Sequence, residues 1–284
     1  MRKFAVIAAL SALLPGASLG ASFTAIAVSG FNYSGIVPHT AAPPYSTSSS
    51  SLDGSNNALF EVGLPSTTAG GVPQGGILPY SANPNTFSFN LGPYGANNLL
   101  RINPTGSLNL VTPATYQSIA ILGFTTGNNA PGSLEMVGDV TLHFSDTTTS
   151  VYSKAIDLAD WMATNPLNPN VVTSAEGGLV NITAGTAAAA FQATPGVPKF
   201  YVSIIQLSVA DAAKTLSAVS FSNFPFGGNG FQFVMAVDGF QPVPVVPPPT
   251  AAPAVDGWRL GLLTLLLAGA AIAGISRLST KSAA

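Results

Sequence analysis

The chain of 284 residues is long enough for one sizeable domain or two small ones, and only 7% of its residues are charged, against about 25% in an ordinary globular protein. It contains no cysteine, which excludes disulfides, thiolate metal sites and a cysteine nucleophile. Four basic and ten acidic residues between residues 21 and 240 leave a net charge of −6, which argues against nucleic acid or anionic lipid as a partner.

The first twenty residues have the pattern of a secretory signal peptide. Arg2 and Lys3 form a positive region, "FAVIAALSALL" is an apolar stretch, and "SLG" supplies the small residues of a cleavage site. The apolar stretch is too short for a lasting transmembrane helix. We therefore expect cleavage between Gly20 and Ala21 and export of the rest of the chain.

Residues 21–85 form a loop-rich amino-terminal part of the core. They are rich in Ser, Thr, Ala, Gly, Pro and Asn, as in "HTAAPPYSTSSSSLDGSNN". The short apolar pieces "FTAIAVSGF" and "ALFEVGL" are candidate strands between these loops. This composition predicts a loosely packed region with one or two edge strands.

Residues 86–240 carry the clearer strand patterns. In "TFSFNL", Phe87, Phe89 and Leu91 alternate and share one face, and the near-continuous apolar run "SIAILGF" predicts a central buried strand. "SLNLV", "GGLVNIT", "KFYVSIIQLSV", "LSAVSFSNF" and "GFQFVMAV" are further strands. Short strands separated by Gly, Pro, Asn and Asp turns predict an all-β fold, an antiparallel sandwich or barrel.

The stretch "DVTLHFSDTTTSVYSKAIDL" predicts a β-hairpin with its turn at "SDTTT". Alternation along its first strand separates inward from outward side chains. The expected inward residues are Val140, Leu142 and Phe144, and the expected outward residues are Thr141 and His143.

The region from Tyr116 to Trp161 resembles jelly-roll domains, some of which bind carbohydrate. In those domains a strand ending in a Gly/Asn loop precedes a "Y-x-D-G-T" hairpin and a closing "DW" pair. The matching residues here are Phe144, Asp146, Thr147, Asp160 and Trp161, and Thr147 replaces the usual glycine after the turn aspartate. The resemblance implies an antiparallel β-sandwich of jelly-roll type.

Trp161 and Tyr152 are the candidate ligand-binding residues, because aromatic faces stack on sugar rings. The alternative is that Trp161 is a packed hinge between strand and loop.

Asp146, Asp157 and Asp160 are candidate ligands for calcium, which prefers oxygen donors. The alternative is that these carboxylates cap turns.

The exported part of the chain carries no G-x-S-x-G elbow and no H-E-x-x-H zinc motif. Its only histidines are His39, in a proline-flanked loop, and His143. We therefore expect that the protein is not an enzyme and that it binds no cofactor other than calcium. Paired carboxylates from distant parts of the chain keep a glycan-active enzyme as the least favoured alternative.

The carboxy-terminal segment begins with a proline-rich spacer at residues 241–254, "QPVPVVPPPTAAPA". Because proline fixes φ and removes a donor, this spacer is expected to be extended and separate from the sheet. The apolar run Leu260–Ile275 would span about 24 Å as a helix, and Arg277 and Lys281 then stay in the cytoplasm. This pattern predicts a transmembrane helix with the core outside.

Residues 255–284, with the proline before them, resemble bacterial carboxy-terminal sorting regions of the PEP-CTERM type, in particular the IPTL-CTERM variant. The residues at the motif positions are Pro253, Val255, Asp256 and Trp258, where "PAVDGW" stands for the usual "PTLSEW". The resemblance implies a sorting peptidase as partner. A plain membrane anchor gives the same topology and remains the alternative.

Together these features predict an exported, non-enzymatic protein of the cell surface or extracellular matrix. It would be anchored in the membrane by its carboxy-terminal helix, or released after processing. The alternative is a carbohydrate-binding sandwich module at the cell surface, with polysaccharide as its partner.

Overall fold

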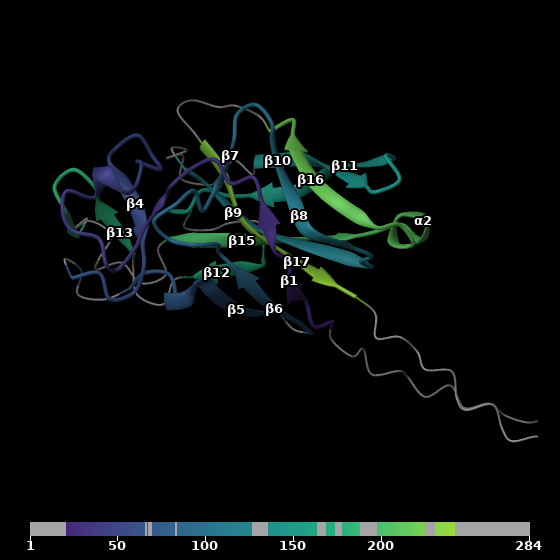
Figure 1. Ribbon diagram of the computed structural model, residues 1–284, viewed down its shortest axis with the longest axis horizontal. Helices are drawn as coiled ribbons and strands as arrows, with labels where there is room; N and C mark the ends of the chain where they lie inside the picture. The colour runs from purple at the N-terminus through teal and green to yellow at the C-terminus, as the bar shows by residue number, and fades with distance from the viewer. Residues whose placement is uncertain are drawn as a thin grey trace, which may run out of the picture. The chain divides into compact units, whose positions relative to one another are not determined.

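The computed structural model describes the core of the chain. It covers residues 21–65, 67, 70–82, 84–126, 136–163, 169–173, 178–187, 198–224 and 231–241. The chain divides after Pro242, and every described residue lies before that point. The described residues form mostly β-strands in antiparallel sheets, with very little helix (Figure 1), which confirms the all-β prediction.

The two terminal segments of the prediction lie outside the described residues. These are the signal peptide at residues 1–20 and nearly all of the spacer and sorting region at residues 241–284. Within the part of the chain that the structure describes, no helix is both long and apolar enough to cross a membrane. The two terminal helices therefore stay predictions.

One layer of the core is a five-stranded antiparallel sheet, which we call the outer sheet. In spatial order its strands are β11 (Thr149–Leu158), β10 (Met136–Phe144), β16 (Leu216–Ser222), β8 (Gly106–Ala114) and β2 (Val28–Ser29). β10 and β11 form the predicted hairpin. The inward side chains of Val140, Leu142 and Phe144 are at most 3% exposed, as the alternation predicted.

The second layer is a six-stranded sheet, which we call the central sheet. Its strands in spatial order are β1 (Thr24–Ala25), β17 (Phe231–Phe240), β9 (Ser118–Thr126), β15 (Lys199–Gln206) and β12 (Val171–Thr173), and β7 (Leu100–Ile102) also pairs with β17. Every residue of β9 and all but the two end residues of β17 are buried. Such burial requires a covering layer on each face. The central position predicted for "SIAILGF" is confirmed.

A hairpin supplies the third layer, on the side of the central sheet away from the outer sheet (Figure 1). Its strands are β5 (Ile77–Ala82) and β6 (Asn85–Asn90). The Phe87 ring stacks on Phe23 with the ring centres 4.7 Å apart. Phe87, Phe89 and Leu91 are at most 4% exposed, which confirms that they share one buried face.

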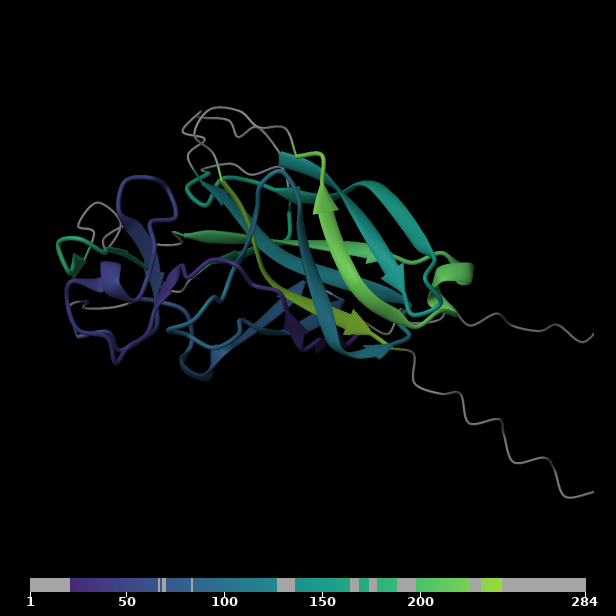
Figure 2. The same ribbon diagram turned by 45° about the horizontal axis from the view of Figure 1, so that its top comes forward.

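A separate four-stranded sheet lies at the left of Figures 1 and 2. Its strands in spatial order are β14 (Thr186–Ala187), β13 (Leu179–Asn181), β4 (Asn57–Phe60) and β3 (Ile36–Val37). It has a small core of its own, made of Val37, Tyr45, Ala58, Phe60, Leu64, Val180 and Ile182.

Several short apolar runs within the loop-rich residues 21–85 are packed in the interior. Ile36, Val37, Leu52 and Phe60 are fully buried. Their apolar runs are short and lie between polar loops, so the sequence pattern is weak. Val37 and Phe60 belong to the small core of this sheet, which forms because β4 pairs with β13, more than a hundred residues further along the chain.

The described helices are short. They are the 3-10 turns η1 (Tyr45–Thr47) and η2 (Gln74–Gly76) and the helix α2 (Val209–Ala212). Ser208 caps α2, since its Oγ accepts a hydrogen bond from the Asp211 N–H at 3.1 Å. The strand patterns did not reveal α2, although the spacing of Ser208 and Asp211 is a helix-start signal.

Asp238 lies in β17 of the central sheet, where its side chain meets the β5–β6 hairpin and has no exposed surface. Its Oδ2 accepts a hydrogen bond from the Ser88 N–H at 2.8 Å, and its Oδ1 has no hydrogen-bond partner among the described residues. Burial raises the pKa of this carboxyl to about 7, against the lowering effect of the Ser88 bond. The folded protein therefore keeps this proton up to near-neutral pH.

Asp238→Asn is expected to make stability less dependent on pH. The folded carboxyl holds a proton between its ordinary pKa of 3.8 and about 7, so the wild type loses stability as pH rises through that window and loses no more above it. From pH 5 to pH 8 the free energy of unfolding should fall by roughly 2–3 kcal/mol more in the wild type than in the variant.

Urea unfolding at a series of pH values measures this difference. Asp146→Asn is the matched control, because Asp146 is an exposed turn residue whose pKa is lowered. Equal pH slopes in the wild type and Asp238→Asn would show that Asp238 ionises normally in the folded protein.

Candidate functional site

Trp161 lies inside the core. Its side chain is 2% exposed, and its ring stacks on Phe124 with the centres 5.5 Å apart and the planes at 6°. The backbone N–H of Trp161 donates to the Thr125 carbonyl at 2.9 Å, which fixes the loop after β11 against the central sheet. The structure thus gives Trp161 the packing role and leaves no free ring face for a sugar.

Tyr152 lies in β11 and anchors α2. Its hydroxyl donates to Asp211 Oδ2 at 2.8 Å and accepts from the Ser208 N–H at 2.9 Å. Ser150 Oγ donates to Asp211 Oδ1 at 2.8 Å. Tyr152 is separated from Trp161 by the rest of β11, about 20 Å of strand. The two aromatic residues therefore do not form a joint platform.

The Asp211 carboxylate is held in its charged form. Burial opposes ionisation, but hydrogen bonds from Ser150, Tyr152 and Ser208, together with the charge of Lys214, outweigh it and lower the pKa. Lys214 Nζ lies 3.9 Å from Asp211 Oδ1. This cluster docks α2 on the end of the outer sheet.

Asp146 lies apart from the other two candidate calcium ligands, Asp157 and Asp160. Asp146 sits at the hairpin turn, where its Oδ1 accepts from Thr148 N–H at 3.0 Å and Thr148 Oγ1 at 2.6 Å. Asp160 Oδ1 accepts from the Met162 N–H at 2.7 Å. Asp157 pairs with Val137 at the end of the hairpin far from the turn. Among the described residues, no three His, Asp or Glu side chains gather in a way that suits a metal ion.

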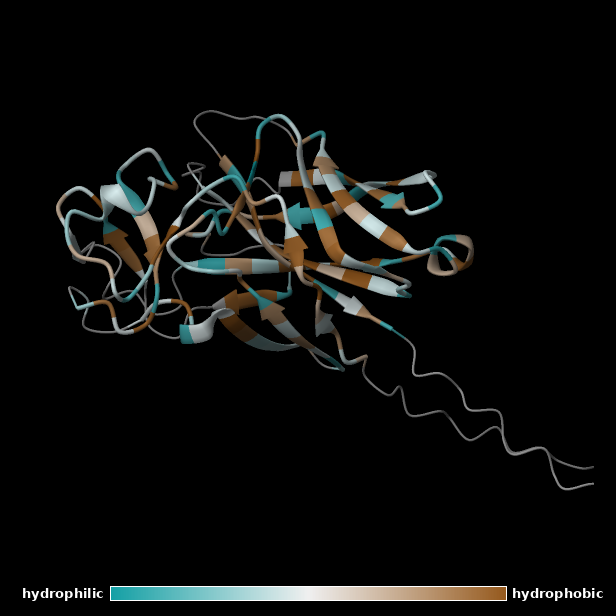
Figure 3. Cartoon of the chain, viewed as in Figure 1, coloured by the Kyte–Doolittle hydropathy of each residue, from teal (hydrophilic) through white to brown (hydrophobic). Residues whose placement is uncertain are grey.

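The exposed face of the outer sheet carries two rows of small polar side chains, which we call the polar rows. Cross-strand register places Val151, Thr141, Ser220 and Ser107 side by side in one row, and Thr149, His143, Ala218, Asn109 and Ser29 in the next. Most are hydroxyl or amide residues, and none is acidic, Lys or Arg. Figure 3 shows polar and apolar residues alternating along β8 and β16.

Hydrogen bonds join three members of the polar rows. His143 Nε2 lies 2.7 Å from Ser220 Oγ, and Ser220 Oγ lies 2.9 Å from Ser107 Oγ. His143 lies on the outward side of its strand, as predicted. The sequence could not single out Ser107 and Ser220, because their approach depends on the register of β8, β16 and β10.

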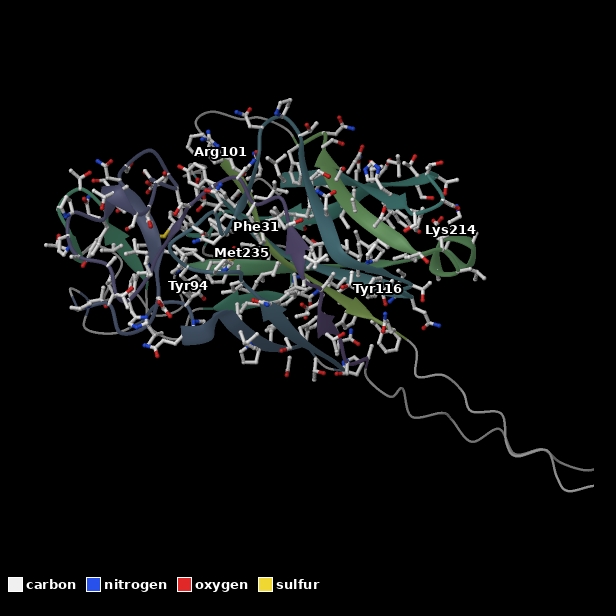
Figure 4. All side chains as sticks on the ribbon, viewed as in Figure 1. Phe31, Tyr94, Arg101, Tyr116, Lys214 and Met235 are labelled. Carbon is white, nitrogen blue, oxygen red and sulfur yellow. The ribbon has the colours of Figure 1, made fainter. Side chains whose placement is uncertain are left out.

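A cavity of about 440 Å³ lies beside α2. It is lined by Thr115, Tyr116, Gln117, Gln206, Leu207, Val209, Ala212 and Ala213. Tyr116, labelled in Figure 4, is 7% exposed, and burial raises the pKa of its hydroxyl. The lining offers amide and apolar contacts but no acid–base pair.

Comparison of the chain with protein-family models, curated proteins and solved structures gave no match.

Trp161→Ala is expected to lower the free energy of unfolding by about 3–5 kcal/mol, because it leaves a cavity beside Phe124 in the core. Trp161→Phe keeps a ring on Phe124 and should lose much less. Denaturant unfolding of both variants measures the losses. A loss below about 1 kcal/mol for Trp161→Ala would contradict the packing role.

Tyr152→Phe is expected to lower the free energy of unfolding by about 1–3 kcal/mol, because it removes a hydrogen bond to the Asp211 carboxylate. Tyr80→Phe is the matched control, since within the described part of the chain the Tyr80 hydroxyl forms no hydrogen bond to another side chain. Equal losses in the two variants would show that the Tyr152–Asp211 contact adds nothing to stability.

Proposed function

We propose that the chain is a non-enzymatic protein of the cell surface or extracellular matrix. The predicted signal peptide exports it, and the predicted carboxy-terminal region anchors or sorts it. The observation that carries the proposal is the pair of polar rows. The side chains of these rows are uncharged and exposed or half-exposed, and their hydroxyl and amide groups suit contact with hydrated neutral polymer.

We further propose that the core is a β-sandwich of jelly-roll type. The chain passes between its two large sheets several times, from β8 in the outer sheet to β9 in the central sheet and back to β10. It crosses again from β15 to β16 and from β16 to β17. Repeated crossing of this kind fits two packed sheets of a Greek-key sandwich.

The second candidate function is carbohydrate binding by the polar rows. Sugar hydroxyls both donate and accept hydrogen bonds, and so do Ser, Thr, Asn and neutral His side chains. In one row Thr141, Ser220 and Ser107 lie on neighbouring strands about 4.8 Å apart, so their hydroxyls could form several such bonds at once. The ligand class is a neutral polysaccharide.

Export and sorting are tested with one epitope in the core and one after Lys281, followed in membrane and medium fractions. Processing predicts that the core epitope separates from the tail epitope. A tail epitope that stays on full-length protein in the membrane favours the plain anchor. Retention of both epitopes in the cytoplasm would overturn the proposal.

Asn109→Arg is expected to weaken binding to a neutral polysaccharide such as dextran at least severalfold, because a long charged side chain then covers a polar row. Val209→Arg is the matched control, because Val209 is 92% exposed and lies in α2, outside these rows. Affinity electrophoresis of the full chain measures both. Equal mobility shifts for the two variants would remove the polar rows from the binding site.

A further inference from the structure

Arg101 is the only arginine between residues 21 and 258, and aromatic rings hold its side chain at the edge of the central sheet. It lies in β7, opposite Phe233 of β17. Its guanidinium carbon is 3.8 Å from the centre of the Phe231 ring and 5.5 Å from that of Tyr33. These are cation–π distances, so the planar group has a defined position.

Asn32 fixes the backbone of the same residue. Its Oδ1 accepts a hydrogen bond from the Arg101 N–H at 2.7 Å, and its Nδ2 donates to the Arg101 carbonyl at 3.0 Å. Both the backbone and the guanidinium of Arg101 are thus held before any ligand binds. Such preorganisation lowers the entropy lost on binding.

The positive charge of Arg101 has no carboxylate partner within the described residues. The ion pairs there join His39 with Glu61 and Lys214 with Asp211. The buried Nε of Arg101 also lacks a hydrogen-bond partner. Arg101 is itself half-exposed, so an anion that reaches its guanidinium meets a positive charge that no carboxylate of the described residues neutralises.

A cavity of about 310 Å³ lies beside the guanidinium and is lined by Asn32, Tyr33, Arg101 and Asn103. The guanidinium fork matches a carboxylate, and the amide of the exposed Asn103 can exchange hydrogen bonds with hydroxyl groups. We propose that this cavity binds a sugar ring that carries a carboxylate, that is, a uronate unit of an extracellular polysaccharide. This inference rests on the proposed surface role, which brings such polymers within reach.

The acidic core limits which polymer fits. The net charge of −6 between residues 21 and 240 repels a long polyanion, but at physiological salt charges more than about 8 Å apart are largely screened. Arg101 therefore suits an isolated uronate in an otherwise neutral chain. This ligand also agrees with the uncharged polar rows.

The test compares methyl β-glucuronide with methyl β-glucoside, which differ in the carboxylate. NMR titration of the full chain in nonionic detergent should show at least about tenfold tighter binding of the glucuronide, the minimum expected for a hydrogen-bonded charged group. Sodium acetate tests for a simple anion site and should bind at least tenfold more weakly than the glucuronide.

Two variants locate the site. Arg101→Lys keeps the charge but loses the fork, so glucuronide affinity should fall about tenfold. Asn103→Ala changes an exposed residue and should cost severalfold in affinity for the glucuronide, with the fold intact. Lys214→Gln is the matched control, because it removes a positive charge beside α2, away from Arg101 (Figure 4), and should leave affinity unchanged.

Equal binding of the two glycosides would overturn the proposal, and so would acetate binding as tight as that of the glucuronide. Unchanged glucuronide affinity in both Arg101→Lys and Asn103→Ala would also overturn it. Fractionation with the two epitopes tests the surface role separately, so the failure of one proposal is distinguishable from the failure of the other.

Discussion

Burial of the central sheet on both faces is the constraint on which the rest of the core depends. β9 and β17 expose almost nothing, so each face of their sheet needs its own cover. The outer sheet covers one face, and the β5–β6 hairpin with Phe23 covers the other. The amino-terminal region therefore belongs to the core, since without it the apolar side chains on one face of the central strands would face water.

The same constraint makes polar side chains in β17 costly. Gln232 and Asp238 are both fully buried, and both amide atoms of Gln232 lack hydrogen-bond partners among the described residues. Asp238 is partly compensated by the Ser88 N–H, which also ties the covering hairpin to the central sheet. A core that buries an acid in this way is most stable when that acid is protonated.

Local periodicity predicted the longer strands but not short ones such as β7 and β12, and it did not predict which strands pair. Alternation identified the buried faces of β6 and β10, and a continuous apolar run identified β9, because each signal lies within a few residues of sequence. The pairing of β4 with β13, the joining of His143 to Ser220, and the meeting of Asn32 with Arg101 depend on register between distant segments. Trp161 shows a different limit of the sequence. The pattern around a single aromatic residue does not distinguish a side chain packed in the core from one that binds a ligand.

Because charged residues are rare in this chain, the surroundings of each charged side chain are informative. In a chain with 7% charged residues, a surface formed by strands presents hydroxyls and amides by default, as in the polar rows. Several of the described carboxylates have partners nearby. Asp146 accepts hydrogen bonds within its turn, Asp211 accepts one from Tyr152 beside α2, and Glu61 contacts His39. Arg101 differs, because aromatic rings rather than a carboxylate contact its guanidinium, and it lines a cavity together with Asn32 and Asn103. One such fixed cation would add selectivity to a broad neutral face, since a charge-assisted hydrogen bond is roughly twice as strong as a neutral one.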